Sequence, residues 1–268
     1  MIGAIIGDIV GSRFEFHNIK TKDFEFFSPE CRITDDSVMT LAIAKAILEA
    51  NGDYDMLGGL AEKHMRQLGR LYCHGDYGIR FRKWLHYDDM GPYNSFGNGA
   101  AMRVSPCGFA AKSMEEAKLL SRRVTEVTHN HPEGIKGAEA TAVCVFMARD
   151  GKTKNEIRSH INEHYYKMDF ALDEIRESYQ FDESCQNTVP QAIAAFIESR
   201  TFEEAVRNAV SIGGDSDTLA AIAGSIAEAA YGVSRKMRKL AMTYIDERLT
   251  SILTVFENAY PSHIKEES

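Results

Sequence analysis

Two short segments of the sequence each place two aspartates and a threonine directly before an alanine-rich stretch. The first is Ile33-Thr-Asp-Asp-Ser-Val-Met-Thr-Leu-Ala42, and the second is Gly213-Gly-Asp-Ser-Asp-Thr-Leu-Ala-Ala-Ile-Ala-Gly224. Carboxylate and hydroxyl oxygens are the ligands that hard divalent cations such as Mg²⁺ and Mn²⁺ prefer. Two acidic segments of similar form, far apart in the chain, therefore indicate a divalent-metal site to which both contribute.

A structural explanation of the same residues also stands. Aspartate is favoured at helix N-termini, because its side chain caps free N–H groups and its charge suits the positive end of the helix dipole. Both segments, however, lead into alanine-rich helices that must be buried. A buried carboxylate is costly unless it is paired or binds a metal. The residues alone leave both interpretations open.

The elements that would position these segments are predicted to be helices. Alanine is the strongest helix former, and Ser/Thr-x-x-Glu before an apolar run is typical of a helix start. Strand-type alternation of Val, Ile and Thr is nearly absent. We expect an all-α fold of about ten or more helices, organised as one compact domain over residues 1–268. The alanine-rich runs are 41–50, 138–148, 192–197 and 219–230, and the capping patterns begin at Ser113, Thr153 and Thr201.

Glycine recurs every four residues near the N-terminus, at Gly3, Gly7 and Gly11. This spacing places the three glycines on one face of the first predicted helix. Without side chains there, a second helix can approach closely, so we expect a packing stripe. Neither G-x-G-x-x-G nor the P-loop pattern occurs, which excludes the usual nucleotide-binding loops.

Composition limits the classes of function. The chain has 268 residues, 44% of them hydrophobic, which suffices for one sizeable core. Its 31 basic against 39 acidic residues make nucleic acid an unlikely general partner. The five cysteines include no CxxC pair, which favours a reducing compartment. No signal peptide or membrane-spanning stretch is predicted, so we expect a cytoplasmic protein without a membrane partner. Nothing in the sequence indicates an oligomeric state.

Five short motifs, in order along most of the chain, resemble those of the ADP-ribosylglycohydrolase family. This family includes the dinitrogenase-reductase-activating glycohydrolases and the ADP-ribosylarginine hydrolases. The motifs are Gly7-Asp8-Ile-Val-Gly11 with Glu15, Thr34-Asp35-Asp36-Ser37, Gly97-Asn98-Gly99-Ala-Ala-Met-Arg103, Thr128-His129-Asn130-His131 and Gly213-Gly-Asp215-Ser-Asp217-Thr218.

The resemblance implies an all-helical single domain with a dinuclear site for two Mg²⁺ or Mn²⁺ ions in a central cleft. It agrees with the metal site suggested by the two acidic segments. It adds Glu15, which without the family would be taken for an ordinary surface glutamate. Carried over by motif, the metal ligands are Glu15, Thr34, Asp35, Asp36, Asp215, Asp217 and Thr218.

A substrate cleft is implied around the third motif. By itself, 93–103 is either a helix-connecting turn or a glycine loop that approaches an anion closely. The resemblance implies that this loop lines an ADP-ribose cleft, with Arg103 in an ion pair beneath it. It also implies that His129 contacts the ribose or phosphate and that His131 supports the loop. The expected substrate-binding residues are Gly97, Asn98, Gly99, Met102 and His129.

Two further patterns have weaker claims. Asp76, in Cys73-His-Gly-Asp76-Tyr-Gly78, matches an Asp-x-Gly of some bacterial relatives that is proposed to act on the substrate ribose. The Ile-Arg-Phe-Arg that follows departs from the family pattern, and a turn aspartate before glycine is an equally good explanation. His160-Ile-Asn-Glu163-His164 matches the inverted zinc-peptidase signature, but a solvated helix face explains it better.

The reaction implied by the resemblance is hydrolysis of the glycosidic bond between ADP-ribose and a modified acceptor, with protein arginine favoured. The expected partner is an ADP-ribosylated protein or a small ADP-ribose conjugate. We expect catalysis by Asp35, Asp36 and Asp76, with Asp36 orienting or deprotonating the water. Alternatives are a two-metal phosphohydrolase and a non-catalytic structural relative. The presence of every expected ligand argues against the second alternative.

Overall fold

The computed structural model describes residues 1–72, 76–262 and 264–265, and these residues are overwhelmingly helical. They form fourteen α-helices, two short 3₁₀ helices and two strands of two residues each. The α-helices are α1 (Ile2–Gly11), α2 (Asp35–Ala50), α3 (Leu57–Leu71), α4 (Ile79–His86), α5 (Ser105–Ala110), α6 (Met114–Thr125), α7 (Pro132–Arg149), α8 (Lys154–His164), α9 (Leu172–Ile175), α10 (Cys185–Ile197), α11 (Phe202–Ser211), α12 (Ser216–Tyr231), α13 (Arg235–Ala241) and α14 (Glu247–Ala259). The 3₁₀ helices are η1 (Ser12–Phe14) and η2 (Asn98–Ala100), and the strands are β1 (Val233–Ser234) and β2 (Ile264–Lys265). The expected all-α fold is confirmed.

All three predicted capping residues start helices. The hydroxyls of Ser113, Thr153 and Thr201 each accept a hydrogen bond from the backbone N–H three residues later. Of these three, Thr153 forms the complete reciprocal box, because the Glu156 carboxylate returns to its N–H. In the other two, the glutamate instead accepts from the N–H of the residue before the cap, Lys112 or Arg200.

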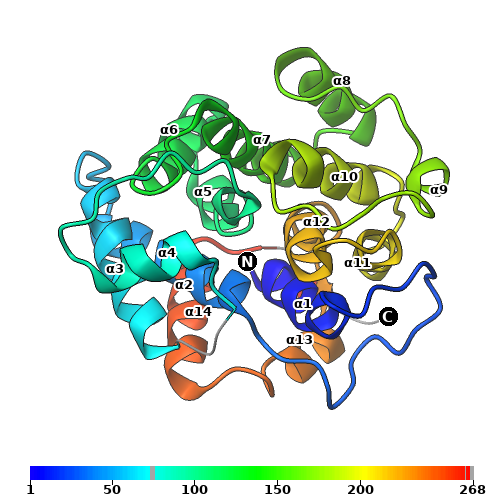
Figure 1. The fold of residues 1–268 in the computed structure, drawn as a ribbon, viewed down its shortest axis with the longest axis horizontal. Helices are drawn as coiled ribbons and strands as arrows, with labels where there is room; N and C mark the ends of the chain where they lie inside the picture. The colour runs from blue at the N-terminus through cyan, green and yellow to red at the C-terminus, as the bar shows by residue number, and fades with distance from the viewer. Residues whose placement is uncertain (73–75, 263, 266–268) are drawn as a thin grey trace.

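The first helix, α1, lies against α12 near the centre of the molecule (Figure 1). The predicted glycine stripe forms this contact. A Cβ atom at Gly7 would overlap the Ala220 carbonyl, and one at Gly11 would lie 2.5 Å from the Asp217 Cα. Close packing of α1 on α12 therefore sets where the residues after Gly11 meet the start of α12.

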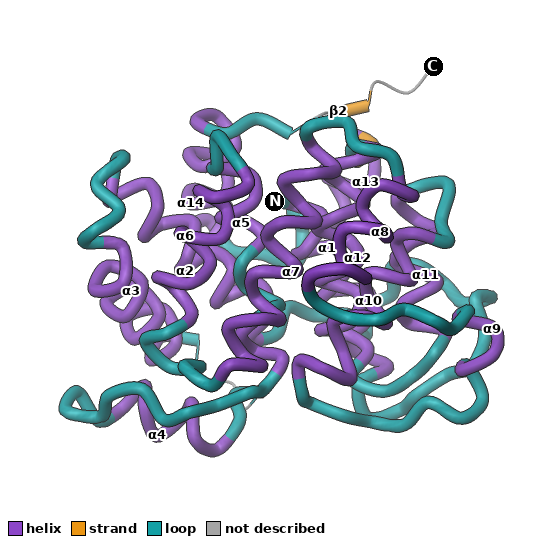
Figure 2. The backbone as a smooth tube through the Cα atoms, turned by 90° about the horizontal axis from the view of Figure 1, so that it is seen from above, coloured by secondary structure: helices purple, strands orange, loops and turns teal. Residues whose placement is uncertain are grey.

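The remaining helices surround this pair. α7, α10 and α11 contact α12, whereas α2 packs against α3, α5 and α14. The strands β1 and β2 pair in parallel, with Val233 opposite Ile264. Figure 2 shows α4 on the side of the molecule opposite to β2.

The alanine-rich runs form the buried helices, as expected: α2, α7, α10 and α12 carry most of the fully buried alanines. Cys31, Cys107, Cys144 and Cys185 are buried and unpaired, while Cys73 lies outside the described residues. None of the helices in the described part of the chain has the length and apolar character needed to cross a lipid bilayer.

Candidate active site

Both acidic segments stand at helix starts, as the sequence indicates. Thr34 is the N-cap of α2, and Asp215 is the N-cap of α12. Gly213 and Gly214 have φ angles of +69° and +77°, a left-handed conformation that side chains disfavour. This turn directs the Asp215 and Asp217 side chains into the cavity that lies before α12.

A cavity of about 530 Å³ brings the two segments together with the glycine loop. Twelve of the thirteen candidate residues line it; Thr34 does not. The lining candidates are Glu15, Asp35, Asp36, Asp76, Gly97, Asn98, Gly99, Met102, His129, Asp215, Asp217 and Thr218. The five sequence motifs thus meet at one cleft.

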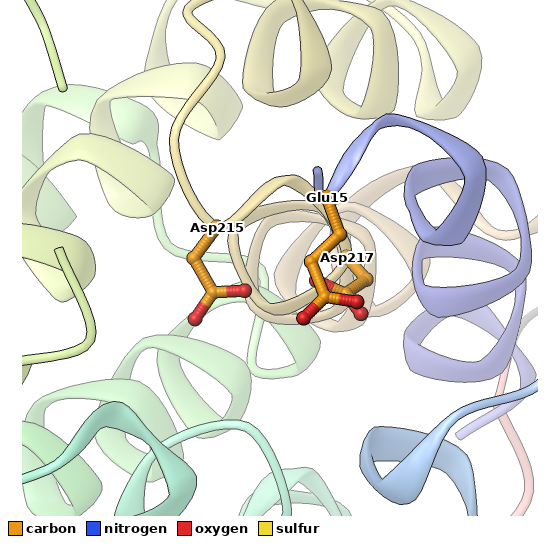
Figure 3. A group of neighbouring side chains, drawn as sticks. All are labelled: Glu15, Asp215 and Asp217. Atoms are coloured by element: carbon orange, nitrogen blue, oxygen red, sulfur yellow. The ribbon is translucent and has the colours of Figure 1, made fainter. Parts of the chain in front are cut away.

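Three carboxylates converge at one place in this cleft. Oxygen atoms of Glu15, Asp215 and Asp217 all lie within 4.8 Å of one another (Figure 3). Glu15 follows η1, directly after α1, so the α1–α12 contact brings it beside Asp217. Glu15 is half-buried, not the surface residue that its neighbours suggest.

These carboxylates are held where ionisation is unfavourable. Burial, reinforced by Asp217 and Asp76, raises the pKa of Glu15 to about 8. Burial also raises the pKa of Asp215 to about 6, and that of Asp217 well above its ordinary range. For Asp35 and Asp36, burial and then Asp217 raise the pKa well above the usual value. A cluster in which negative charge is costly suits a bound cation.

The donor atoms fit a divalent cation. Buried oxygens of two of these residues, Oε2 of Glu15 and Oδ1 of Asp36, have no hydrogen-bond partner. The other Asp36 oxygen, Oδ2, accepts a bond of 3.2 Å from the Thr218 hydroxyl, which ties α2 to α12. Unpartnered buried carboxylate oxygens beside a carboxylate cluster are the donor set that Mg²⁺ or Mn²⁺ takes.

Asp8 supports the site from below, a role that sequence analysis missed although the residue stands in a matched motif. It is fully buried in α1 and accepts hydrogen bonds from the backbone N–H groups of Thr34 and Ser37, both 3.0 Å. It also accepts from both hydroxyls, that of Thr34 at 2.8 Å. The signal was an aspartate inside an apolar helix, where a charge needs several partners. The Thr34 hydroxyl is thus directed to Asp8, and its role as a metal ligand stays a prediction.

The glycine loop is fixed to the acidic cluster through Asn98. The Asn98 side chain donates to Asp215 at 2.7 Å and to the Thr188 hydroxyl at 3.1 Å. Its backbone N–H donates to the Glu183 carbonyl at 2.6 Å. These hydrogen bonds hold the loop backbone rigid beside the acidic cluster. An anion-binding loop requires such a rigid backbone.

His129 closes the loop from the opposite side. A Cβ added at Gly97 or Gly99 would lie 3.6 or 3.5 Å from its Nε2 atom. Its Nδ1 lies 2.8 Å from the Thr128 hydroxyl, whose oxygen accepts a bond of 2.7 Å from Arg103. When the threonine donates to Nδ1, the proton of neutral His129 stands on Nε2 and faces the cleft. Burial, then Arg103, lowers the pKa of His129 well below its ordinary value.

The expectation that Arg103 forms an ion pair is wrong. Within the described residues no carboxylate pairs with it; its guanidinium bonds Thr128 and lies over the Phe81 ring, 5.7 Å from the centroid. Burial lowers the pKa of Arg103 to about 10. The loop is supported by a hydrogen bond to a hydroxyl and an aromatic face instead of a salt bridge.

The other histidines that the sequence patterns singled out, His131, His160 and His164, do not line the cavity. His131 is the N-cap of α7, where its Nδ1 accepts from the Glu133 N–H at 3.1 Å. Its ring also contacts that of Phe96 in the 93–103 loop, with centroids 5.3 Å apart, while its support of that loop stays a prediction. His160 and His164 share one face of α8 with ring centroids 4.5 Å apart. Among the described residues, none of these three histidines belongs to a group of three potential metal ligands.

The cleft also contains side chains that sequence analysis did not select. Phe16, Arg80 and Tyr93 line it. Arg80 stands in the Ile-Arg-Phe-Arg sequence that departs from the family pattern, at the start of α4. A cleft-lining role depends on how α4 packs, so no local signal pointed to it.

The fold and the site together define a helical protein with an oxygen-rich acidic centre where two helix N-termini meet. A family model described as ADP-ribosylglycohydrolase matches residues 1–250. The chain belongs to the ADP-ribosylglycohydrolase family.

Individual relatives are distant. Mouse ADP-ribosylhydrolase ARH3 is 25% identical, in an alignment covering 88% of this chain and 83% of the mouse protein. ADP-ribosylarginine hydrolase Tri1 of Pseudomonas putida is 28% identical, covering 87% of this chain and 70% of that protein. The ADP-ribosyl-(dinitrogen reductase) glycohydrolase of Rhodospirillum rubrum is 28% identical, covering 87% and 84%. A solved structure titled "ADP-ribosylglycohydrolase-related protein complex" superimposes with a TM-score of 0.65 at 23% identity, covering 97% of this chain and 92% of that one, which shows the shared fold.

Proposed function

We propose that this protein is a metal-dependent hydrolase that cleaves the glycosidic bond between ADP-ribose and a modified acceptor, with arginine as the favoured acceptor. The observation that carries the proposal is the single cavity that joins the carboxylate cluster to the Gly97–Gly99 loop and His129. One end suits cations and ribose hydroxyls, and the other suits a diphosphate. The activities named for the relatives support the same reaction class.

The polarity of the cleft orients the substrate. The side chain of Arg80, together with Arg103 and His129 beside the loop, favours the negative diphosphate at the loop end. The distal ribose then reaches the carboxylate cluster, where the bond to the acceptor breaks. Asp76, at the edge of the same cavity, is placed to accept a hydrogen bond from a ribose hydroxyl.

We propose that two Mg²⁺ or Mn²⁺ ions are held by Glu15, Thr34, Asp35, Asp36, Asp215, Asp217 and Thr218. Five carboxylates oppose the four positive charges of two such ions, so most of the repulsion within the cluster is offset. Bound there, the cations supply Lewis acidity that orients hydroxyl oxygens and lowers the pKa of water.

The residues of this chain perform the proton transfer. Oδ2 of Asp36 accepts a hydrogen bond from Thr218, whereas Oδ1 has no hydrogen-bond partner, so we assign to Oδ1 the proton of the attacking water. Positive charge develops on the ribose in the transition state, which the surrounding carboxylates stabilise. A guanidine leaving group is itself basic, so an arginine conjugate needs no strong dedicated acid.

The test is release of ADP-ribose from ADP-ribosylarginine, with Mg²⁺ or Mn²⁺ and with chelator. We expect cation-dependent release in the wild type and its loss in Asp36→Ala, with the circular dichroism spectrum retained. Asp89→Ala is the matched control, because Asp89 is exposed and lies outside the cavity lining. Full activity in Asp36→Ala would disprove the role of the cluster. Release of inorganic phosphate instead of ADP-ribose would indicate a phosphohydrolase.

A further inference from the structure

Two phenylalanine rings stand exposed at the acidic end of the cleft. Phe16 is 73% exposed and Phe181 is 43% exposed, and their rings stack with centroids 6.3 Å apart and planes at 24°. Phe16 lines the cavity and directly follows Glu15 of the carboxylate cluster. Exposed aromatic pairs that no other part of the chain covers are typical of binding surfaces.

The backbone on both sides of the pair is anchored. Before Phe181, the Tyr179 hydroxyl donates to the Asn187 carbonyl at 2.6 Å, and after it, Asp182 accepts from the Ser184 N–H at 2.7 Å. Near Phe16, the Asn18 side chain donates to the Gly214 carbonyl at 2.8 Å. The segment of Phe16 is therefore attached to the same turn that directs Asp215, and the segment of Phe181 is held by the start of α10 and the residue before it.

No cation of the described chain occupies these ring faces. The cation–π contacts of the described residues involve other rings, those of Phe14, Phe24, Phe26, Phe81, Trp84, Phe146 and Tyr166. Two cations of neighbouring segments are engaged elsewhere: Lys20 donates to the Tyr179 and Ile212 carbonyls, and Arg32 pairs with Asp76. The ring faces that Phe16 and Phe181 do not turn toward each other are left for a cation that comes with the substrate.

We infer that the Phe16–Phe181 pair is the acceptor-side platform, on which the guanidinium of an ADP-ribosylated arginine stacks. The inference rests on the proposed function, because it needs the scissile bond beside the carboxylate cluster. A planar guanidinium stacks on an aromatic face, and its apolar stem gains contact area there. Negative side chains nearby favour the same positive group. A serine conjugate, whose leaving group is neutral, gains no cation–π stabilisation.

The experiment compares two linkages in one set of variants. KM and kcat are measured for ADP-ribosylarginine and ADP-ribosylserine, together with the Kd of free ADP-ribose, in wild type, Phe16→Ala, Phe16→Leu and Phe181→Ala. Tyr87→Ala is the matched control, since Tyr87 is 62% exposed but does not line the cavity.

We expect Phe16→Ala to raise KM for the arginine conjugate about fivefold, the size of a single cation–π contact. The KM of the serine conjugate and the Kd of free ADP-ribose should each change by less than about twofold. Phe16→Leu should behave like Phe16→Ala, because it keeps apolar contact but has no ring face. Phe181→Ala should show a smaller effect of the same selectivity, and Tyr87→Ala none.

Three outcomes would overturn the inference. An equal rise in KM for the arginine and serine conjugates would mean that Phe16 acts through Glu15. A higher Kd for free ADP-ribose would place the rings at the nucleotide end of the cleft. An unchanged arginine KM would remove the platform altogether. If the wild type cleaves neither conjugate, the proposed hydrolase fails separately. In that case the Kd of the arginine conjugate, measured by calorimetry, still tests the inference. Phe16→Ala must raise this Kd by a larger factor than it raises the Kd of free ADP-ribose.

Discussion

Arg32 and Asp76 form a two-pronged ion pair at the edge of the cleft. The guanidinium donates to Oδ2 at 2.7 Å and to Oδ1 at 2.9 Å. The pair joins the segment before α2 to the segment before α4, and Asp76 is 16% exposed while Arg32 is 47% exposed. The carboxylate that sequence analysis proposed for catalysis is thus held in one orientation by an arginine that it did not select.

We predict that Arg32→Ala lowers kcat/KM about tenfold, because Asp76 loses its orientation. Arg32→Lys should recover part of the loss, since lysine keeps the charge but not the two-pronged geometry. Stability should change by about 1 kcal/mol or less, because the arginine is about half exposed and its charge is screened by water. Steady-state kinetics of Arg32→Ala, Asp76→Asn and the double variant check this: the double variant should be no worse than Asp76→Asn alone. If the losses in kcat/KM of the two single variants multiply in the double variant, the two residues act independently.

We predict opposite stability effects for two buried Asp→Asn changes in the metal-free protein. Burial raises the pKa of Asp217 well above its usual range, so a neutral amide there removes a cost, and Asp217→Asn should stabilise by about 1–2 kcal/mol. Asp8 accepts four hydrogen bonds, and an amide cannot accept them all, so Asp8→Asn should destabilise by about 2–4 kcal/mol.

Urea denaturation with and without Mg²⁺ checks both changes. The wild type should gain stability with Mg²⁺, and Asp217→Asn should lose that gain. Asp89→Asn, at an exposed position, should match the wild type in both conditions. A less stable metal-free Asp217→Asn protein would contradict the assignment of Asp217 to a repulsive carboxylate cluster.

We predict that Gly7→Ala costs more than about 3 kcal/mol or prevents folding, because the added methyl group overlaps the Ala220 backbone and forces α1 from α12. Gly59 in α3 is the matched control. A Cβ there meets nothing within 4 Å, so Gly59→Ala should stabilise by about 0.5–1 kcal/mol through helix propensity alone. Thermal denaturation followed by circular dichroism measures both. A tolerated Gly7→Ala would show that α1 and α12 can separate without loss of the fold.

We predict that His129 makes the protein sensitive to acid. Its pKa in the folded state is depressed by burial and by Arg103. The unfolded chain therefore takes up a proton first as the pH falls below about 6.5, and stability present above that pH is lost by up to about 1.4 kcal/mol per pH unit. The difference in unfolding free energy between wild type and His129→Gln, measured from pH 7 to pH 5, should shrink toward the lower pH. A difference that stays constant from pH 7 to pH 5 would contradict the depressed pKa of His129.

Local patterns were sufficient for several of the helices of this fold. Hydroxyl caps at Ser113, Thr153 and Thr201 and the alanine-rich runs predicted helices where they occur, because capping and propensity depend on neighbours a few residues apart. The glycine stripe of α1 predicted a close helix contact for the same reason. The two acidic segments indicated a metal-type site, since oxygen donors at a helix start are visible in the sequence itself.

Tertiary packing decided what surrounds those segments. The hydrogen bonds from Thr34 to Asp8 span 26 residues, and that from Asn98 to Asp215 spans 117. Arg103 bonds a threonine instead of the expected carboxylate, and Arg32 reaches Asp76 across 44 residues. A short-range pattern states which groups need partners, whereas the partner a buried group obtains depends on which distant segments the packed helices bring within about 3 Å of it.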